Sequence, residues 1–458
     1  MAVYSINPQK VFFDNKGKFP PIALEAEPAV PPADSPQTTP KRITDTTLRD
    51  GAQDPRFALF PVEARLRYFD LLHKLDNGTG VIESLEVFIY QERDVWCLQK
   101  LLERGYQYPQ VTTWTRATPK DIKTFLEVSG GAVKETGMLA SASDHHIFDK
   151  LGFRSKEEAA EKYLAPILTA WESGIRPRIH LEDATKADVG GWVIPFMRRV
   201  LDETGGAARF RVCDTMGHGL PDPAAPLPYG IPRLIGTLAR ETGAELEFHG
   251  HNDFGLATAN TIAAWKYGAK RANTAFAGLG ERTGNTSLEQ VLAHYIRLYG
   301  DPGLKLEVLM EIKELIGREV VPLSDKSPII GDVFSTQAGI HQSGLERQQQ
   351  AEGGLIYLPF EPELLGREGE EHSRIGALSG LEGIISVLNR QVKQATGREG
   401  GYSATSRAAK YVYDRIQDAY NGRYDAASGR WVDYRTTFFS PEEVLALARE
   451  YEARRGQA

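Results

Sequence analysis

The chain has 458 residues, and its 54 lysines and arginines against 61 aspartates and glutamates give a formal net charge of −7. This mildly acidic balance, without long runs of either sign, disfavours nucleic acid and anionic lipid as partners. Hydrophobic residues make up 41% and charged residues 25%, and no stretch approaches the ~20 apolar residues of a membrane helix. Two cysteines and the lack of a secretory pattern favour a soluble, cytoplasmic protein.

Proline dominates the first 40 residues, which hold eight of the 26 prolines. A segment this poor in large apolar residues cannot build a core of its own. We therefore predict a proline-rich N-terminal extension over residues 1–40, followed by the folded part of the chain.

From Arg42 onward, short β-rich runs alternate with amphipathic helical segments. The pattern predicts eight strands, near 43–48, 84–89, 111–115, 135–140, 178–181, 209–213, 245–248 and 271–275. Eight strands alternating with helices over about 250 residues match a closed (β/α)8 barrel, an α/β fold that we assign to residues 41–287. An open, doubly wound sheet is the alternative, but the Gly-rich dinucleotide turn expected after its first strand is missing.

Helical patterns continue beyond the predicted barrel, over 288–299, 304–316, 378–395 and 406–420. We therefore predict that residues 288–458 form a smaller, mainly helical C-terminal region. It is long enough to pack on the barrel or on a second subunit.

Polar side chains gather where the predicted strands end, which is where barrel enzymes build their active sites. The first strand runs into Arg49-Asp50-Gly51, and the seventh into His249-Gly250-His251. Side chains at i and i+2 on an extended chain lie on one face, so the two imidazoles can bind one ion. With Asp50 they leave positions open for substrate, which is typical of a catalytic metal site. The alternative interpretation of an isolated Arg-Asp turn is a solvent-exposed salt bridge without a catalytic role.

Four ordered motifs resemble the homocitrate synthase and isopropylmalate synthase family of metal-dependent TIM barrels. They are DTTLRDG at 45–51, HGHND at 249–253, GLGERTGN at 278–285 and AGIHQ at 338–342. The resemblance covers nearly all of the chain after the proline-rich extension. The segments at 113–117, 141–148 and 254–257 are most similar to the branch of Re-type citrate synthase and 2-phosphinomethylmalate synthase.

The resemblance implies roles for the residues at the strand ends. Asp50, His249 and His251 match the family's ligands for a divalent metal ion, which would be Mn²⁺, Mg²⁺, Co²⁺ or Zn²⁺. Arg49 matches the arginine that stabilises developing negative charge. Glu182, in the fifth strand, matches an acid/base glutamate.

The same resemblance implies a set of substrate-binding residues. Arg178 matches an arginine that binds a substrate carboxylate, and Thr215 matches a threonine that binds the keto-acid carboxylate. Gln53 is expected beside the reacting groups. Glu281 and Asn285, in the Gly-rich loop, are expected at the substrate, with Asn285 beside the metal.

Two residues of the C-terminal region are also expected at the site. His341, in AGIHQ, matches a histidine that a neighbouring subunit contributes near the acetyl group. Tyr357 is the matching tyrosine, although the segment at 348–354 between them is longer than in the family. The resemblance therefore implies a homodimer with shared active sites.

These assignments predict an acyltransferase that condenses acetyl-CoA with an anionic 2-oxo acid and releases CoA and a citrate-like 2-hydroxy acid. Arg178, His180 and Thr215 would form a polar pocket suited to the second anionic group of oxaloacetate or of a phosphino- or phosphono-pyruvate analogue. Homocitrate synthase acting on 2-oxoglutarate is the alternative. Isopropylmalate synthase, a metal-dependent aldolase or lyase, and a non-catalytic metal-binding scaffold are less favoured. Ala52 also stands where the family usually has an acidic residue.

Overall fold

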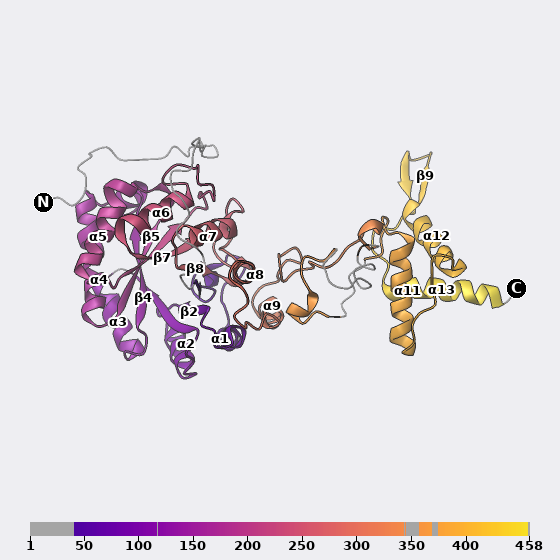
Figure 1. Ribbon diagram of the computed structural model, residues 1–458, viewed down its shortest axis with the longest axis horizontal. Helices are drawn as coiled ribbons and strands as arrows, with labels where there is room; N and C mark the ends of the chain where they lie inside the picture. The colour runs from indigo at the N-terminus through magenta and orange to yellow at the C-terminus, as the bar shows by residue number, and fades with distance from the viewer. Residues whose placement is uncertain (1–40, 117, 343, 345–356, 369–373, 457–458) are drawn as a thin grey trace. The chain divides into compact units, whose positions relative to one another are not determined.

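The computed structural model describes residues 41–116, 118–342, 344, 357–368 and 374–456. The predicted extension over 1–40 lies outside the described residues. The chain divides into two compact units after Ile330. The first unit is a closed barrel of eight parallel strands that pair in chain order, with helices around the outside (Figure 1). The predicted (β/α)8 barrel is therefore confirmed.

All eight predicted strands are present, each within a few residues of its expected position. The strands are β1 Arg42–Asp45, β2 Ile82–Val87, β3 Gln110–Thr115, β4 Glu135–Ser141, β5 Arg176–Glu182, β6 Arg209–Asp214, β7 Glu245–Gly250 and β8 Arg271–Thr274. Because β8 pairs with β1, the barrel has no free edge.

Nine helices of the described residues belong to the barrel unit, one after each strand and one more. They are α1 Val62–Asp76, α2 Glu92–Leu102, α3 Pro119–Ser129, α4 Lys156–Glu172, α5 Ile194–Glu203, α6 Ile231–Thr242, α7 Ala257–Lys266, α8 Leu288–Tyr299 and α9 Val308–Glu319. Local signals set several of their ends. Ser155 caps α4 by accepting from the Glu158 N–H at 3.1 Å, and Asn77 ends α1 in the left-handed conformation.

Alternation along the strands sends charged side chains into the barrel and apolar ones toward the helices. In β5 and β6, for example, Arg178 and Arg211 are 1% exposed inside the barrel, whereas Ile179 and Phe210 pack outward and are fully buried. The hydrophobic core is therefore the layer between strands and helices, where each fully buried large apolar side chain contributes about 1.5–3 kcal/mol. The barrel interior is held by ion pairs instead.

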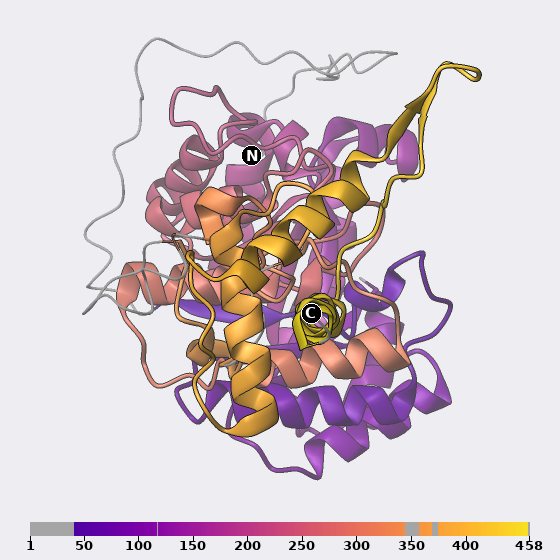
Figure 2. The same ribbon diagram turned by 90° about the vertical axis from the view of Figure 1, so that its right-hand side faces the viewer.

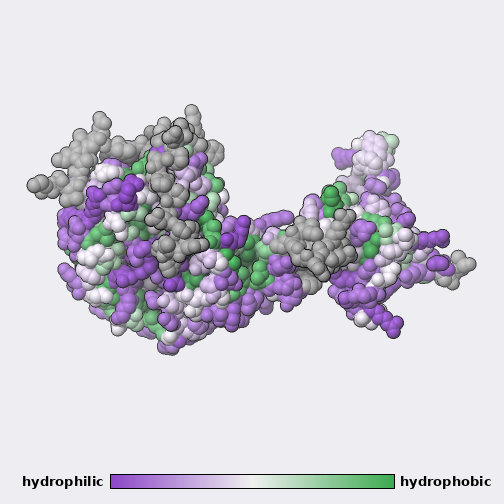
Figure 3. All heavy atoms as spheres, viewed as in Figure 1, coloured by the Kyte–Doolittle hydropathy of each residue, from purple (hydrophilic) through white to green (hydrophobic). Residues whose placement is uncertain are grey.

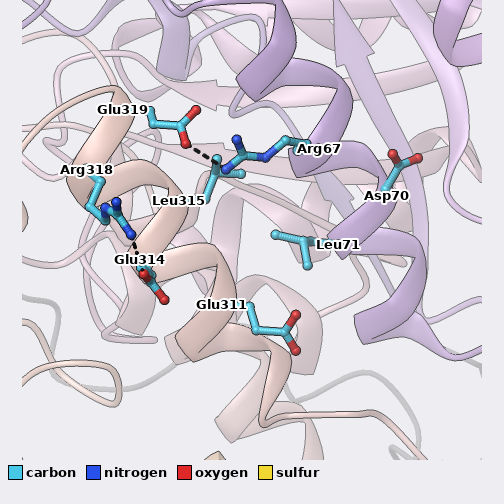
Figure 4. A pocket seen from close by; sticks show the side chains of 8 residues that line it. All are labelled: Arg67, Asp70, Leu71, Glu311, Glu314, Leu315, Arg318 and Glu319. Carbon is cyan, nitrogen blue, oxygen red and sulfur yellow. Dashed lines mark hydrogen bonds and ion pairs between the residues drawn. The ribbon is translucent and has the colours of Figure 1, made fainter.

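The ninth helix extends the first unit beyond the predicted barrel boundary. Helix α9 packs along α1, where Arg67 pairs with Glu319 at 2.7 Å and Lys74 with Glu311 at 2.6 Å. Figure 4 shows the charged groove between the two helices, which Leu71 and Leu315 also line. The first compact unit ends after Ile330, whereas the sequence pattern placed the end of the barrel at residue 287. The unit is longer because α8 completes the ring of helices and α9 packs on α1.

The second unit begins at Gly331 and is mainly helical, as predicted. Its core lies between α11 Leu381–Thr396, α12 Arg407–Asn421 and α13 Pro441–Gly456, and Figure 2 looks almost along the axis of α13. The sequence analysis missed α13 and the short hairpin of β9 Arg423–Asp425 and β10 Arg430–Val432. The hairpin carries an exposed aromatic pair, Tyr424 and Trp431, with ring centroids 5.9 Å apart.

The face of the molecule seen in Figure 3 is mainly hydrophilic. Most of the described residues on this face are hydrophilic, and hydrophobic residues appear only in small areas. Among the described helices, none combines the length and apolar character needed to cross a membrane.

A buried acidic pair lies behind the first strand, between α1 and α8. Burial raises the pKa of Glu289 to about 7, and the nearby Asp45 adds to the rise. Burial also raises the pKa of Asp45 to about 7, against hydrogen bonds from Thr47 and Tyr68. A carboxyl group whose pKa is raised in the folded state stabilises the fold at low pH and ceases to do so as the pH rises through the folded pKa.

We therefore expect Glu289→Gln to reduce the loss of stability that the protein shows as the pH rises through 7. The neutral amide still accepts from the Ala277 N–H, which is 2.9 Å from the Glu289 carboxylate, but it never ionises. The change in unfolding free energy between about pH 5 and pH 8 should be smaller in the variant by about 3 kcal/mol. Denaturant unfolding at both pH values measures it, with Glu103→Gln on the exposed end of α2 as the control. Parallel pH curves for the variant and the unmodified protein would contradict this account.

Candidate active site

A pocket of about 200 Å³ opens at the carboxyl ends of the barrel strands. Most of the residues that the sequence analysis assigned to the site line this pocket. They are Arg49, Asp50, Gln53, His180, Glu182, Thr215, His249, His251 and Glu281.

The turn after β1 presents Arg49 and Asp50 together. The Thr46 carbonyl accepts hydrogen bonds from the N–H groups of Arg49 and Gly51, both at 3.0 Å, which closes the turn. The Thr46 hydroxyl donates to Glu86 at 3.0 Å and thereby fixes the turn to β2. The DTTLRDG motif therefore forms a hydrogen-bonded turn joined to β2, rather than a solvent-exposed salt bridge.

Asp50, His249 and His251 converge as a possible metal site. Their ligand atoms lie within 4.8 Å of one another, and the Nε2 atoms of the two imidazoles are 3.2 Å apart. Two ligands at about 2.1 Å from one ion and at right angles to each other would be about 3.0 Å apart. The spacing of the imidazoles therefore fits a shared cation.

The protonation states at this cluster are those that a metal requires. Burial lowers the pKa of His249 to about 3 and also lowers the pKa of His251, so both imidazoles are neutral at pH 7. Burial alone would raise the pKa of Asp50, but Arg49 and the two imidazoles hold it well below its ordinary range. The set thus offers one carboxylate and two neutral nitrogens.

Neighbouring amides orient these groups. Asn273 lies 2.8 Å from the Nδ1 of His249 and accepts its hydrogen, which leaves Nε2 as the ligand atom. Asn285 donates to Asp50 at 2.8 Å and lies behind it, outside the set that lines the pocket. The buried Oδ1 of Asn285 has no hydrogen-bond partner, which fits an oxygen beside a cation. The residues present therefore fit a divalent metal ion.

Arg49 is fixed from three sides. It donates to Asp50 at 2.5 Å, its Nε lies 3.2 Å from Glu86, and its guanidinium stacks over the Trp114 ring at 5.2 Å. The sequence analysis missed Glu86, although a carboxylate between Leu85 and Val87 in a buried strand was a signal for it. A buried carboxylate of this kind needs cationic partners.

The structure does not bring Arg178 to the pocket, which corrects the expected role of this arginine. Its guanidinium lies beneath the site inside the barrel, paired with Glu86 and with Glu135 at 2.7 Å. His180 does line the pocket, but burial lowers its pKa well below the ordinary value, so it is neutral. The cationic side chains of the pocket are instead Arg49 and Arg282.

Glu182 lies at the pocket and accepts three hydrogen bonds. The donors are Ser141 at 2.6 Å, Lys150 at 2.8 Å and His146 at 3.0 Å. Burial would raise its pKa, but these donors lower it to about 2. The carboxylate therefore stays ionised, which suits it to holding cationic neighbours rather than to taking a proton.

Several pocket residues escaped the sequence analysis. Phe88, Trp114, Leu139 and Cys213 form apolar parts of the lining, and Arg282 stands at its edge. Phe88 follows β2, whereas Trp114 and Leu139 lie within β3 and β4 near their carboxyl ends, and no polar motif marks these three residues. Arg282, however, lies inside the recognised GLGERTGN loop.

His341 and Tyr357 belong to the second unit, and the structure brings them together. Their ring centroids are 4.5 Å apart at an interplanar angle of 32°. The two rings therefore form one pair. The longer segment at 348–354 that separates them lies outside the described residues.

The class of protein follows from the fold, the site and the match to a known family. The HMGL-like family matches residues 41–316, which is more than half of the chain, so the chain belongs to this family. It is 39% identical to a Citrate (Re)-synthase of Clostridium kluyveri over 76% of both chains. It is 37% identical to a Citrate (Re)-synthase of Syntrophus aciditrophicus, over 89% of this chain and 62% of that one. It is also 35% identical to the 2-phosphinomethylmalate synthase of Streptomyces hygroscopicus, over 76% and 80%.

We expect His251→Ala to weaken divalent metal binding by about 100-fold or more, because it removes a ligand rather than a supporting contact. Calorimetric titration of EDTA-treated protein with Mn²⁺ measures the change. His294→Ala, a histidine on α8 outside the pocket, should bind Mn²⁺ like the unmodified protein. Equal affinity of the His251 variant and the control would rule out this cluster as the metal site.

Proposed function

We propose that this protein condenses acetyl-CoA with an anionic 2-oxo acid, oxaloacetate or a phosphorus-bearing analogue of it. The products are free CoA and a citrate-like 2-hydroxy acid. The observation that carries the proposal is the placing of the Asp50, His249 and His251 cluster directly beside Arg49 in one pocket. The identity with Re-citrate synthases and with a 2-phosphinomethylmalate synthase supports the same substrate class.

The pocket residues have separate roles in binding and activating the 2-oxo acid. A bound divalent ion, Mn²⁺, Mg²⁺, Co²⁺ or Zn²⁺, would polarise the keto group as a Lewis acid. Arg49 faces the same space and stabilises the negative charge that develops on oxygen during attack. The Thr215 hydroxyl accepts from the Asp183 N–H at 2.8 Å, so its hydrogen is available to donate to the substrate carboxylate. Gln53 and Glu281 line the same pocket.

The condensation needs a base for the methyl group of acetyl-CoA. We assign this role to His341, supported by Tyr357, because the low pKa of Glu182 makes that carboxylate a poor base. The base takes one methyl proton, and the resulting carbon attacks the keto carbon of the 2-oxo acid. A carbon–carbon bond forms as the keto oxygen becomes a hydroxyl, and hydrolysis of the thioester releases CoA. We propose that His341 reaches the site from a partner subunit of a homodimer.

The choice of 2-oxo acid depends on the charge and size of the pocket. Citrate contains an acetyl group joined to oxaloacetate, and two of the relatives are named for making it. The homocitrate alternative finds no support among these relatives. Phe88, Trp114 and Leu139 add bulky side chains to the lining of this small pocket, which favours the shorter acid.

Cys97 and Cys213 are buried and form no disulfide, which supports the proposed cytoplasmic location.

We expect oxaloacetate to exceed 2-oxoisovalerate in kcat/KM by about 100-fold or more, because an isopropyl group leaves polar groups of the pocket unpaired. Thiol release from acetyl-CoA, measured with oxaloacetate, phosphonopyruvate, 2-oxoglutarate and 2-oxoisovalerate, tests this order. A preference for 2-oxoglutarate would restore the homocitrate alternative. A preference for the branched acid would contradict the proposed substrate class.

We expect inactive His341→Ala and Arg49→Ala subunits to regain activity when they are mixed. In a dimer with shared sites, one of the two sites then has its own Arg49 and the intact His341 of the partner. Subunit exchange followed by the thiol-release assay should recover up to about a quarter of the unmodified activity, since half of the dimers are mixed and each has one intact site of two. Heterodimers that form without recovering activity would restrict His341 to its own chain.

A further inference from the structure

Arg282 makes one more contact than an arginine in an ordinary surface ion pair does. Its Nε and one terminal nitrogen donate to the two carboxylate oxygens of Asp253, at 2.8 and 2.9 Å. The same terminal nitrogen donates to the backbone carbonyl of Thr215 at 2.5 Å. The arginine side chain is 37% exposed, so the pair with Asp253 alone would contribute little. The third contact, to a pocket residue, is what gives Arg282 a function.

The backbone around Arg282 is built to aim this side chain. Arg282 itself has a φ of 57°, a conformation that non-glycine residues adopt rarely and at a cost. On the other side of the turn, a Cβ on Gly284 would lie only 1.8 Å from the Gly278 carbonyl, so the turn closes on itself. The Asn252 N–H donates to the Gly284 carbonyl at 2.9 Å and fastens the turn to the loop after β7.

Thr215 is held from two directions as a result. Arg282 binds its carbonyl, and the Asp183 N–H binds its hydroxyl oxygen at 2.8 Å. Both contacts use acceptor sites of Thr215 and leave its hydroxyl hydrogen to donate. Two residues further on, a Cβ on Gly217 would lie 2.9 Å from the His251 carbonyl, so the β6 loop packs closely on the β7 loop. Arg282 thus joins the loops after β6, β7 and β8 at the pocket.

We propose that Arg282 is a positioning residue that holds the Thr215 hydroxyl in place for the carboxylate of the 2-oxo acid. This inference rests on the proposed function, because Thr215 is assigned there to the substrate. The hydrogen bonds of Arg282 go to Asp253 and Thr215 and not to Asp50, His249 or His251, although its charge acts on His251 and Asp50. Replacement by lysine keeps this charge and should therefore weaken binding of the 2-oxo acid and leave metal binding intact.

Arg282→Lys tests whether the planar guanidinium of Arg282 is required, since an ammonium group cannot make the three contacts together. We expect the KM for oxaloacetate to rise about tenfold, with kcat and the KM for acetyl-CoA changed by less than about threefold, as for the loss of a uniform binding contact. Mn²⁺ affinity should be unchanged. Arg56→Lys is the matched control, because Arg56 forms the same kind of two-point pair with Asp54 but does not line the pocket.

A double-mutant cycle tests whether Arg282 acts through Thr215. In a Thr215→Val background, which lacks the hydroxyl, Arg282→Lys should raise the KM for oxaloacetate by less than about twofold. In a Thr215→Ser background, which keeps the hydroxyl, it should again raise it about tenfold. If Arg282→Lys does not fold, Asp253→Asn weakens the other end of the contact and should raise the same KM.

The outcomes separate this inference from the function on which it rests. An unmodified protein without activity toward any 2-oxo acid would overturn the proposed function. An active protein whose KM for oxaloacetate is the same in the Arg282 variant would overturn the role of Arg282 alone. A variant that loses Mn²⁺ affinity, or full additivity with Thr215→Val, would also overturn it, because Arg282 would then support the loops in general.

Discussion

The carboxylate of Glu86, shared by three arginines inside the barrel, is the interaction on which the site depends. It pairs with Arg178, with Arg211 at 2.9 Å and with Arg49 at 3.2 Å, and Glu86 itself is 1% exposed. Burial would raise the pKa of Glu86, but Arg211, Arg178 and Arg49 hold it well below the ordinary value. Removing one partner of a buried pair of this kind costs about 3–5 kcal/mol, so the arrangement resists change.

This network connects the two halves of the catalytic apparatus. Arg211 also pairs with Glu247, whose carboxylate accepts from Thr44, and Thr44 in turn accepts from Asn273 at 2.9 Å. Asn273 orients His249. A continuous chain of ion pairs and hydrogen bonds therefore runs from the guanidinium of Arg49 to an imidazole of the metal cluster. Because the barrel interior is occupied by these groups, the position of Arg49 relative to the cluster is set by rigid strands rather than by loops.

The sequence predicted the strands well because their apolar residues and the turns between them are local signals. It predicted that His249 and His251 converge with Asp50 because His-x-His on an extended chain places both imidazoles on one face. It failed on Arg178, since the motif that carries this arginine does not say which layer of the barrel it occupies. Charged residues in β5, β6 and β7 alternate with apolar ones, so that Arg178, Arg211 and Glu247 all point inward, and only the closed barrel makes them neighbours. The packing of α9 on α1 could not be predicted either, because these helices lie far apart in the sequence.

The barrel pocket stabilises charge, yet its buried titratable groups are poorly suited to moving protons near neutral pH. Burial lowers the pKa values of His180, His249 and His251 and raises that of Cys213 well above its ordinary value, while hydrogen bonds lower that of Glu182 to about 2. A general base works best when its pKa lies near the operating pH. These pocket groups are thus fixed in one protonation state, and the ligand atoms of His249 and His251 stay free of protons and able to bind a cation. The acetyl group consequently needs a base from outside this set of residues, which is the role proposed above for His341.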